Sequence, residues 1–380
     1  MLISHTIAML LMLTVPHRGE DEIDLARVPE VYRERVAESW RLAGKQRGEL
    51  EEFLAGVEDS LMEEASFLVA NLPYRDLGVA QAAMLRENLI WAVKARESMP
   101  WGHAVPDELF LHYVLPHRVS QERWQSWRPF FYERLAGVLS ECGGMTEAAL
   151  AVNRWLDDQI DFVSTERRDQ GPVTTVRRGI GRCEEMTIAF IAASRAVGIP
   201  ARQCWTPWWS LADNNHAWAE VWADGAWHYV GAGEASEQLD RAWFSEPARH
   251  AAAVYSLCFG RWAGRDVYKA GERFSIINST AVYAVSCTLL VRPLGEPGAV
   301  TAAVSVFNYG VFRPIAEQEI APGGDVRFVV GAGTYLVMAG DDSRGFWRLA
   351  EVRPDSVTTV TEFLAPPAVP AGFLWLRGGR

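Results

Sequence analysis

The most informative stretch of the chain runs from residue 179 to residue 202 and reads G-I-G-R-C-E-E-M-T-I-A-F-I-A-A-S-R-A-V-G-I-P-A-R. An apolar run follows Cys183 as far as Val197, and Gly198 and Pro200 come directly after it. A glycine after the last apolar position and a proline shortly beyond it are typical of a helix C-terminus. We therefore predict a buried helix from about Cys183 to Val197, with the Cys183 thiol at its N-terminus.

A second stretch, residues 213–234, reads D-N-N-H-A-W-A-E-V-W-A-D-G-A-W-H-Y-V-G-A-G-E. Its first half alternates like a strand, and Asp224-Gly225 predicts a two-residue hairpin turn. The expected cross-strand pairs are Ala223 with Ala226, Trp222 with Trp227 and Glu220 with Tyr229. By side-chain alternation, His216 then lies on the same face as position 231.

A thiol at a helix N-terminus and a histidine at the start of a strand suggest nucleophilic acyl transfer, in which the imidazole takes the thiol proton. Cys183 in G-x-G-x-C-E-E, His216 in N-N-H-A-W-A-E-V-W and the later G-I-P-A-R together resemble the transglutaminase-like superfamily. The resemblance covers about residues 145–262 and implies a papain-like core with a Cys-His-acid triad. It also implies thiol-dependent chemistry at an amide carbonyl. Members of the superfamily crosslink proteins, cleave peptide bonds or remove N-glycans, and some have lost activity.

The acidic member of the triad is missing at its usual place. Where the family carries Asp on the second strand, this chain has Gly231, and the nearest acid is Glu234 in G-A-G-E. That segment resembles the peptide N-glycanase branch of the superfamily, and its two glycines can bend the strand back toward His216. We predict that Glu234 orients His216. Two alternatives stay open: a structural or substrate-contacting Glu234, and Asp213 as the orienting acid.

The surroundings of Cys183 in the sequence favour a thiolate. A helix N-terminus and nearby cations lower the pKa of a thiol, whereas burial raises it. The nearby cations are Arg177, Arg178 and Arg182, of which at least two are expected to be solvated or paired with carboxylates. We expect the pKa of Cys183 to lie below the free-cysteine value of about 8.5, and Cys183 to be the most reactive cysteine. The remaining cysteines, Cys142, Cys204, Cys258 and Cys287, are expected to be buried free thiols.

The core segment is rich in aromatic residues, and four of its tryptophans are candidates for contacting substrate. These are Trp205, Trp208, Trp209 and Trp218. The alternative is that they are core residues, because Trp buries a large area. Three histidines, His103, His112 and His117, have spacing too loose for a metal site, so no metal or cofactor is expected.

The pattern of the chain predicts an α+β protein with a helical N-terminal region and a C-terminal β-sandwich-like domain. The expected segments are a signal or disordered segment (1–19), a helical region (20–144), the transglutaminase-like core (145–263), the β-sandwich (264–365) and a tail (366–380). Residues 145–163 are expected to form a helix that leads to the Cys183 turn.

Net charge and hydropathy bear on whether the protein binds nucleic acid or spans a membrane. The net charge of −11 argues against nucleic-acid binding, and no apolar run is long enough to predict a membrane-spanning helix. If residues 1–17 are a signal peptide, an extracytoplasmic location is favoured; otherwise the protein is expected in the cytoplasm.

The sequence thus predicts a cysteine-dependent amide hydrolase or acyltransferase with Cys183 as nucleophile and His216 as base. Its expected substrate is a protein, peptide or glycoprotein, and hydrolysis is favoured because nothing in the sequence identifies a site for an amine acceptor. Protein crosslinking and peptide N-glycanase-like deglycosylation remain alternatives. A further alternative is an inactive relative that binds a protein or glycan, which the replacement of Asp by Gly231 favours.

Overall fold

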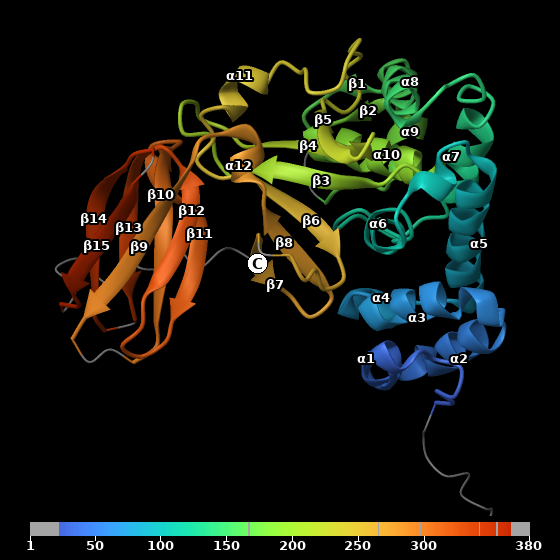
Figure 1. The fold of residues 1–380 in the computed structure, drawn as a ribbon, viewed down its shortest axis with the longest axis horizontal. Helices are drawn as coiled ribbons and strands as arrows, with labels where there is room; N and C mark the ends of the chain where they lie inside the picture. The colour runs from blue at the N-terminus through green and yellow to red at the C-terminus, as the bar shows by residue number, and fades with distance from the viewer. Residues whose placement is uncertain are drawn as a thin grey trace, which may run out of the picture.

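The computed structural model describes residues 23–165, 168–264, 266–295, 298–341, 343–354 and 356–365. The predictions for segments 1–19 and 366–380 lie outside the described residues. Helices come first along the chain, a mixed helix-and-sheet region follows, and two further sheets end it (Figure 1). The predicted α+β class is therefore confirmed.

The N-terminal region is helical because its apolar residues recur at helical spacing, as Leu85, Leu89 and Ala92 do on the buried side of α5. Helices α4 and α6 each begin directly after a proline, Pro73 and Pro106. The helices are α1 (Glu30–Leu42), α2 (Arg47–Ala55), α3 (Met62–Asn71), α4 (Tyr74–Leu77), α5 (Ala82–Ser98), α6 (Asp107–Tyr113) and α7 (Arg128–Leu135). Short 3₁₀-helices lie at Gly44–Gln46, Asp59–Leu61 and Gly102–Ala104.

A six-stranded antiparallel sheet forms the centre of the molecule, in the order β5-β4-β3-β6-β8-β7. Its strands are β3 (Ala201–Thr206), β4 (His216–Ala223), β5 (Ala226–Val230), β6 (Tyr255–Phe259), β7 (Val267–Ala270) and β8 (Phe274–Asn278). Asp224 and Gly225 both have positive φ, as a tight hairpin turn requires. The β4–β5 register pairs Glu220 with Tyr229 and Trp222 with Trp227, which confirms the predicted hairpin.

Helix α10 (Cys183–Ala196) packs on this sheet against β3 and β4. On its other sides lie α5, α7, α8 (Met145–Asp157) and α9 (Pro172–Arg178). The helix expected over residues 145–163 is too long, since α8 ends at Asp157. Residues Asp161–Phe162 form a short strand, β1, parallel to β2 (Ile180–Gly181), because the chain must pair there with the segment that leads into Cys183.

The C-terminal sheets share one apolar core, with residues such as Leu289, Val304 and Val337 buried between them. The sheet orders are β11-β10-β13-β14 and β12-β9-β15. The strands are β9 (Ser286–Leu294), β10 (Val300–Asn308), β11 (Val311–Ile320), β12 (Val326–Gly331), β13 (Gly333–Gly340), β14 (Gly345–Val352) and β15 (Val357–Phe363). The short helices α11 (Ser245–Ala248) and α12 (Thr280–Tyr283) precede them.

The predicted sandwich boundary at Gly264 does not match the strand pairing. Strands β7 and β8 follow that position, yet they pair with β6 and extend the central sheet. The alternating pattern of a strand predicts that it is a strand, but not which sheet it joins. In the part of the chain that the structure describes, no helix is both long and apolar enough to cross a membrane.

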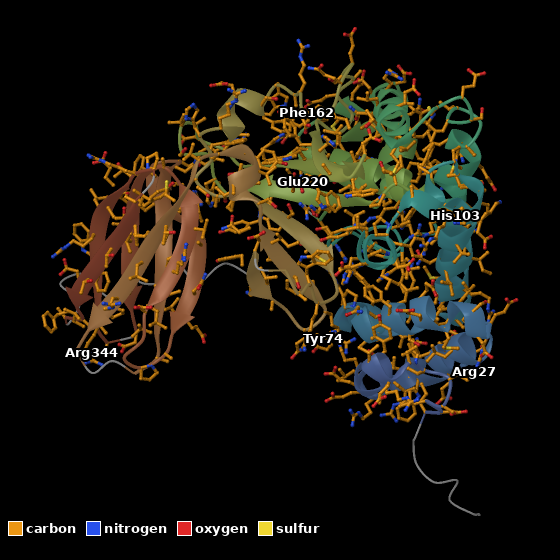
Figure 2. All side chains as sticks on the ribbon, in the orientation of Figure 1. Arg27, Tyr74, His103, Phe162, Glu220 and Arg344 are labelled. Atoms are coloured by element: carbon orange, nitrogen blue, oxygen red, sulfur yellow. The ribbon has the colours of Figure 1, made fainter. Side chains whose placement is uncertain are left out.

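Glu220 on β4 connects the central sheet to its surroundings. Its carboxylate accepts hydrogen bonds from Arg202 Nε, Ser256 Oγ and the Tyr283 hydroxyl, so it joins β3, β6 and α12. The side chains of Glu220 and Arg202 are 1% and 7% exposed, and Glu220 lies in the middle of the molecule (Figure 2). Removing one member of such a buried ion pair leaves an uncompensated charge.

We therefore expect Glu220→Ala to lower the free energy of unfolding by about 3–5 kcal/mol in urea denaturation. The control is Glu351→Ala, which removes the partner of Arg353 at a site 60% exposed and is expected to change stability by no more than about 0.5 kcal/mol. Equal losses in the two variants would contradict the role assigned to Glu220.

Candidate active site

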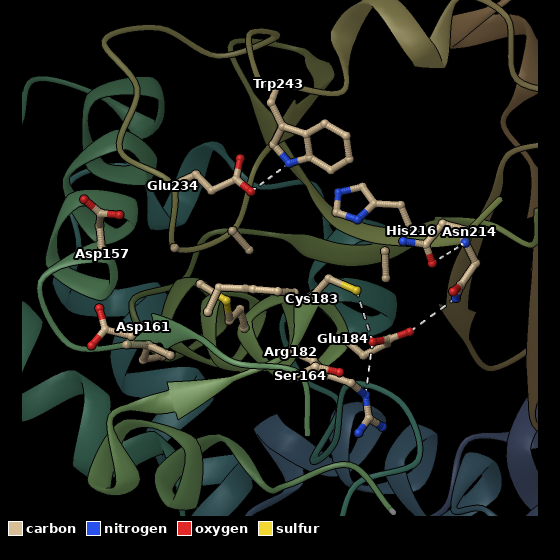
Figure 3. A pocket seen from close by; sticks show the side chains of 17 residues that line it. Asp157, Asp161, Ser164, Arg182, Cys183, Glu184, Asn214, His216, Glu234 and Trp243 are labelled. Atoms are coloured by element: carbon tan, nitrogen blue, oxygen red, sulfur yellow. Dashed lines mark hydrogen bonds and ion pairs between the residues drawn. The ribbon is translucent and has the colours of Figure 1, made fainter. Parts of the chain in front are cut away.

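Cys183 and His216 line the same pocket, which has a volume of about 770 Å³ (Figure 3). Cys183 is the first residue of α10, and His216 is the first residue of β4. Because α10 packs against β4, the two side chains are brought together from positions far apart in the sequence. Among the described residues, however, no hydrogen bond joins the sulfur to the imidazole.

Buried polar contacts hold the start of α10 in place. The Glu185 carboxylate accepts a hydrogen bond from the backbone N–H of Arg182, which is one half of a capping box. Glu185 also accepts hydrogen bonds from Thr165 Oγ1 and from the backbone N–H and side chain of Gln170. The loop before the helix is thereby tied to its first turn, which fixes where the thiol lies.

The nearest polar partner of the thiol is Glu184, its neighbour in the sequence. Cys183 Sγ donates a hydrogen bond to Glu184 Oε2 at 3.1 Å, and Arg182 Nε donates to the same oxygen at 3.2 Å. The other carboxylate oxygen accepts a longer hydrogen bond from Asn215 Nδ2 at 3.4 Å. Figure 3 shows Glu184 below the sulfur, on the side away from Trp243. Sequence reasoning missed Glu184, although its position beside the nucleophile was the available signal.

The expected lowering of the thiol pKa is wrong in direction. Burial, and after it the Glu184 carboxylate, raises the pKa of Cys183 to about 12, while backbone N–H groups of Ala217 and Glu184 oppose the shift. The neighbouring cations do not reverse it. Arg182 is itself ion-paired with Asp169 and Glu184, so its charge is compensated.

His216 is enclosed by aromatic rings. It is 8% exposed and lies 4.8 Å from the Trp243 ring and 4.9 Å from the Phe244 ring, centroid to centroid. Trp209 and Trp218 stack nearly parallel to it at 6.4 and 5.8 Å. Burial lowers the pKa of His216 to about 4, against the opposing charge of Glu184. At neutral pH the pair is therefore a protonated thiol and a neutral imidazole.

The candidate substrate-binding tryptophans do not line this pocket. Trp218 is fully buried and donates to the Tyr283 hydroxyl, and Trp209 is 6% exposed. Trp205 and Trp208 pack toward the C-terminal β core. Trp209 and Trp218 instead wall His216, which is a structural role, and contact of Trp205 and Trp208 with substrate stays a prediction. The aromatic residues that do line the pocket, besides His216, are Phe162 and Trp243, for which the sequence offered no motif.

Glu234 lies in the pocket, in the space that a side chain at Gly231 would need. A Cβ atom added to Gly231 would come within 2.4 Å of Glu234 Oε2. The turn that brings Glu234 there is held by the buried side chain of Asn153, which donates to the carbonyls of Gly231 and Glu234 and accepts from the Gly233 N–H. Gly233 has φ +70°, a conformation that favours glycine.

Glu234 nevertheless binds Trp243 rather than His216. Its Oε1 accepts a hydrogen bond from Trp243 Nε1 at 2.9 Å. Burial raises the pKa of Glu234; the hydrogen bond from Trp243 opposes this shift, and the charge of Asp157 adds to it. The acid is therefore linked to His216 through the indole ring and not by a direct hydrogen bond. Asp213, the other candidate acid, accepts instead from the Tyr309 backbone N–H.

The histidines considered for a metal have other contacts. His112 Nδ1 contacts the Phe259 carbonyl, and His117 Nε2 lies 2.8 Å from Asp76 Oδ2. No group of three or more His, Cys, Asp or Glu side chains suited to a metal ion occurs among the described residues.

The contact with Glu184 generates a testable expectation. Glu184→Gln removes the negative charge beside the thiol, so the pKa of Cys183 falls and the rate of alkylation by iodoacetamide at neutral pH rises by about tenfold. Asp161→Asn is the matched control, because Asp161 lines the same pocket without a hydrogen bond to the sulfur. A rate that stays unchanged in Glu184→Gln, or that rises equally in both variants, would show that the contact does not set the reactivity.

One family model covers this site. The family model described as "Transglutaminase-like superfamily" matches residues 133–232, which include Cys183 and His216. No curated protein matches the chain.

Similar solved structures include a "putative cysteine protease" from Cytophaga hutchinsonii, with 17% identity and a TM-score of 0.24 over 40% of this chain and 57% of that one. Another is red sea bream transglutaminase, with 9% identity and a TM-score of 0.26 over 75% of this chain and 59% of that one. The chain thus spans less than two-thirds of either protein. With the family match on the Cys183 helix and the His216 strand, residues 133–232 form a domain of the transglutaminase-like superfamily.

Proposed function

We propose that the protein performs thiol-dependent acyl transfer at an amide carbonyl, and specifically that it hydrolyses an amide bond of a peptide or glycoprotein. The observation that carries the proposal is the meeting of Cys183, at the N-terminus of α10, and His216, at the start of β4, in one pocket. A cysteine nucleophile needs a base nearby and open space in front of the sulfur, and the shared lining of this pocket supports both requirements.

In the proposed reaction, Cys183 Sγ attacks the amide carbonyl carbon and its proton passes to His216. The imidazolium then protonates the departing amine, which leaves an acyl group on the sulfur as a thioester. Water, deprotonated by His216, attacks the thioester, releases the acid and returns the proton to the thiol. The backbone N–H groups of Ala217 and Glu184, which face the sulfur, are suited to bind the developing oxyanion.

The resting site must change before this reaction starts. The thiol donates to Glu184 and not to His216, so substrate binding has to turn the sulfur toward the imidazole. Arg182 and Asn215 already donate hydrogen bonds to the Glu184 carboxylate, so the carboxylate stays hydrogen-bonded when the thiol turns away from it. The proposed role of Glu184 is therefore to hold the free enzyme in a protonated, unreactive state.

A second candidate is an inactive relative that binds a protein or glycan. The raised pKa of Cys183 favours it, and so does the lack of an acid hydrogen-bonded to His216 among the residues that the structure describes. Protein crosslinking and deglycosylation are further versions of the same acyl transfer. In crosslinking an amine accepts the acyl group in place of water, and in deglycosylation the leaving group is the glycan amine. Nothing among the described residues marks a separate site for an amine acceptor.

The experiment incubates the protein with a denatured glycoprotein in water enriched in heavy oxygen, with and without an added primary amine. Mass spectrometry then distinguishes a labelled carboxylate, a released glycan and an amine adduct. We expect a labelled carboxylate at a peptide or glycopeptide amide. Cys183→Ala is expected to abolish the product, and His216→Ala to lower its rate by about 10²–10⁴-fold. Product formed equally by Cys183→Ala would refute the mechanism, and an absence of any product favours the inactive relative.

Glu234 is tested with two variants. We propose that it acts through Trp243, so Glu234→Gln, which keeps an oxygen acceptor for the indole, is expected to change kcat/KM by less than about tenfold. Glu234→Ala loses the hydrogen bond to Trp243 and is expected to lower kcat/KM by more than Glu234→Gln does. If both variants instead lose about 10⁴-fold, as expected for a triad acid, the carboxylate orients His216 directly.

A further inference from the structure

A second cavity, of about 600 Å³, lies where the N-terminal helices meet the central sheet. Its walls come from α4, the segment 117–121 and the ends of β6 and β8, and it shares no lining residue with the Cys183 pocket. Tyr74, labelled in Figure 2, lies at this junction. Arg195, near the C-terminal end of α10, lines it, so this one helix reaches both cavities. A volume of this size and a position between two parts of the fold are typical of a small-molecule site.

More arginines than acidic residues line this cavity. Its charged lining residues are Arg75, Arg118, Arg195, Arg273 and Glu272, with His117 beside them. The Arg195 guanidinium donates only to main-chain carbonyls, and Arg75 donates to the Gln121 carbonyl. Neither has an ion pair among the described residues. The carboxylate charge that acts on Arg195 is that of Glu122, and Arg75 acts on the carboxyl of Asp76.

Two of the lining arginines are ion-paired, so acidic side chains compensate their charge. Arg118 pairs with Asp76, and Arg273 pairs with Glu38. Burial lowers the pKa of Arg118; Asp76 and Glu122 oppose the shift, and Arg75 and Arg168 add to it. Like charges therefore lie close enough to repel one another, and a bound anion would relieve that repulsion.

Several buried side-chain nitrogens of the lining residues make no hydrogen bond, among them His117 Nδ1 and Arg118 Nη2, although Arg118 Nη2 lies 2.7 Å from Asp76 Oδ2 in an ion pair. Arg118 Nε and Arg273 Nε are buried and make no hydrogen bond, although the two residues are only 4% and 3% exposed. Buried donors are nearly always satisfied, so an orphaned pair beside a cavity indicates a missing acceptor. An anion in the cavity supplies it, directly after a small side-chain rotation or through an ordered water.

The remaining surface of the cavity is apolar. Leu257, Phe259 and Phe274 line it from the sheet, and Tyr74 lines it from α4. Tyr74 and Phe274 are 51% and 40% exposed, so apolar surface is still open for a ligand to cover. A bare inorganic anion would leave this surface uncovered, and a neutral apolar molecule would leave the unsatisfied arginine donors without an acceptor.

We propose that this cavity binds a small molecule that joins an anionic group to an apolar body. The anionic group is a carboxylate, sulfonate or phosphate placed against the arginines, and the apolar body lies along Tyr74, Phe259 and Phe274. The site is independent of the chemistry proposed for Cys183.

The test titrates the full chain with two fluorescent probes that share their aromatic rings. Anilinonaphthalene sulfonate carries an anionic group, and phenylnaphthylamine does not. We expect the sulfonate to bind at a single site, with a Kd at least about tenfold lower than that of the neutral probe. Its binding is expected to weaken as ionic strength rises. Competition by naphthoate and by naphthyl phosphate then distinguishes a carboxylate from a phosphate head, and inorganic phosphate tests the head alone.

Two variants locate the site. Arg75→Glu reverses an exposed charge on the wall and is expected to weaken sulfonate binding at least about fivefold. Ser120→Trp fills the cavity and is expected to weaken it more than about tenfold. The matched control is Arg134→Glu, because Arg134 is also exposed, lies on a helix and donates to a main-chain carbonyl. That control is expected to bind as the wild type does, and so is protein alkylated at Cys183.

The proposal fails if the sulfonate does not bind, if the neutral probe binds as tightly, or if Arg75→Glu behaves like Arg134→Glu. Arg75 is exposed, so its variant remains informative even if Ser120→Trp does not fold. Because alkylated protein is used in parallel, failure at this cavity is distinguishable from failure of the function proposed for Cys183.

Discussion

The burial of helix α10 is the constraint on which the rest of the structure depends. Every residue from Glu185 to Ala196 is buried, between the central sheet on one side and four helices on the other. Only the first turn reaches open space, where Cys183 and Glu184 are partly exposed. A helix fixed along its whole length positions its first residue accurately, which is what a nucleophile requires. The β4 strand, packed on the same helix, brings His216 to that end.

Several opposing effects act on the pKa of the Cys183 thiol, and the largest of them decides whether the thiol is protonated. A helix N-terminus and nearby backbone N–H groups favour the thiolate, as they do in reactive cysteines generally. Here burial and the adjacent Glu184 carboxylate act the other way and are larger, while Arg182 is occupied by carboxylates. Burial by the aromatic walls lowers the pKa of His216, which keeps the imidazole neutral just as burial keeps the thiol neutral. The resting pair is therefore uncharged, and activation is assigned to the bound substrate.

Much of the core could be predicted from the sequence, because its signals are local. The α10 helix, the Asp224-Gly225 turn and the β4–β5 register follow from periodicity and turn chemistry over a few residues. The missing side chain at Gly231 also directed attention to Glu234, and the structure puts its carboxylate in that space. The predictions that failed concern contacts between segments that lie far apart in the sequence. Strands β7 and β8 join the central sheet rather than the sandwich, and no local pattern encodes that choice.

The environment of each side chain was equally hard to predict. The sequence showed which tryptophans lie near His216 along the chain. Whether each lines the pocket depends on its burial, which composition does not reveal. The arginines near Cys183 were expected to lower the thiol pKa, although at least two of the three were expected to be solvated or paired with carboxylates, and Arg182 is in fact paired with Asp169 and Glu184. The hydrogen bond from Cys183 to Glu184 depends on a side-chain rotamer. These are tertiary properties, and they decide the pKa more than the motif does.

The central claim is that the free protein holds Cys183 as a protonated thiol. The most direct measurement is the ultraviolet absorbance of the thiolate as a function of pH, taken as the difference between the wild type and Cys183→Ser. With the pKa of Cys183 raised to about 12, no thiolate signal is expected up to about pH 9. A thiolate step below about pH 7 that disappears in His216→Ala would contradict the account, because it would show a preformed thiolate–imidazolium pair.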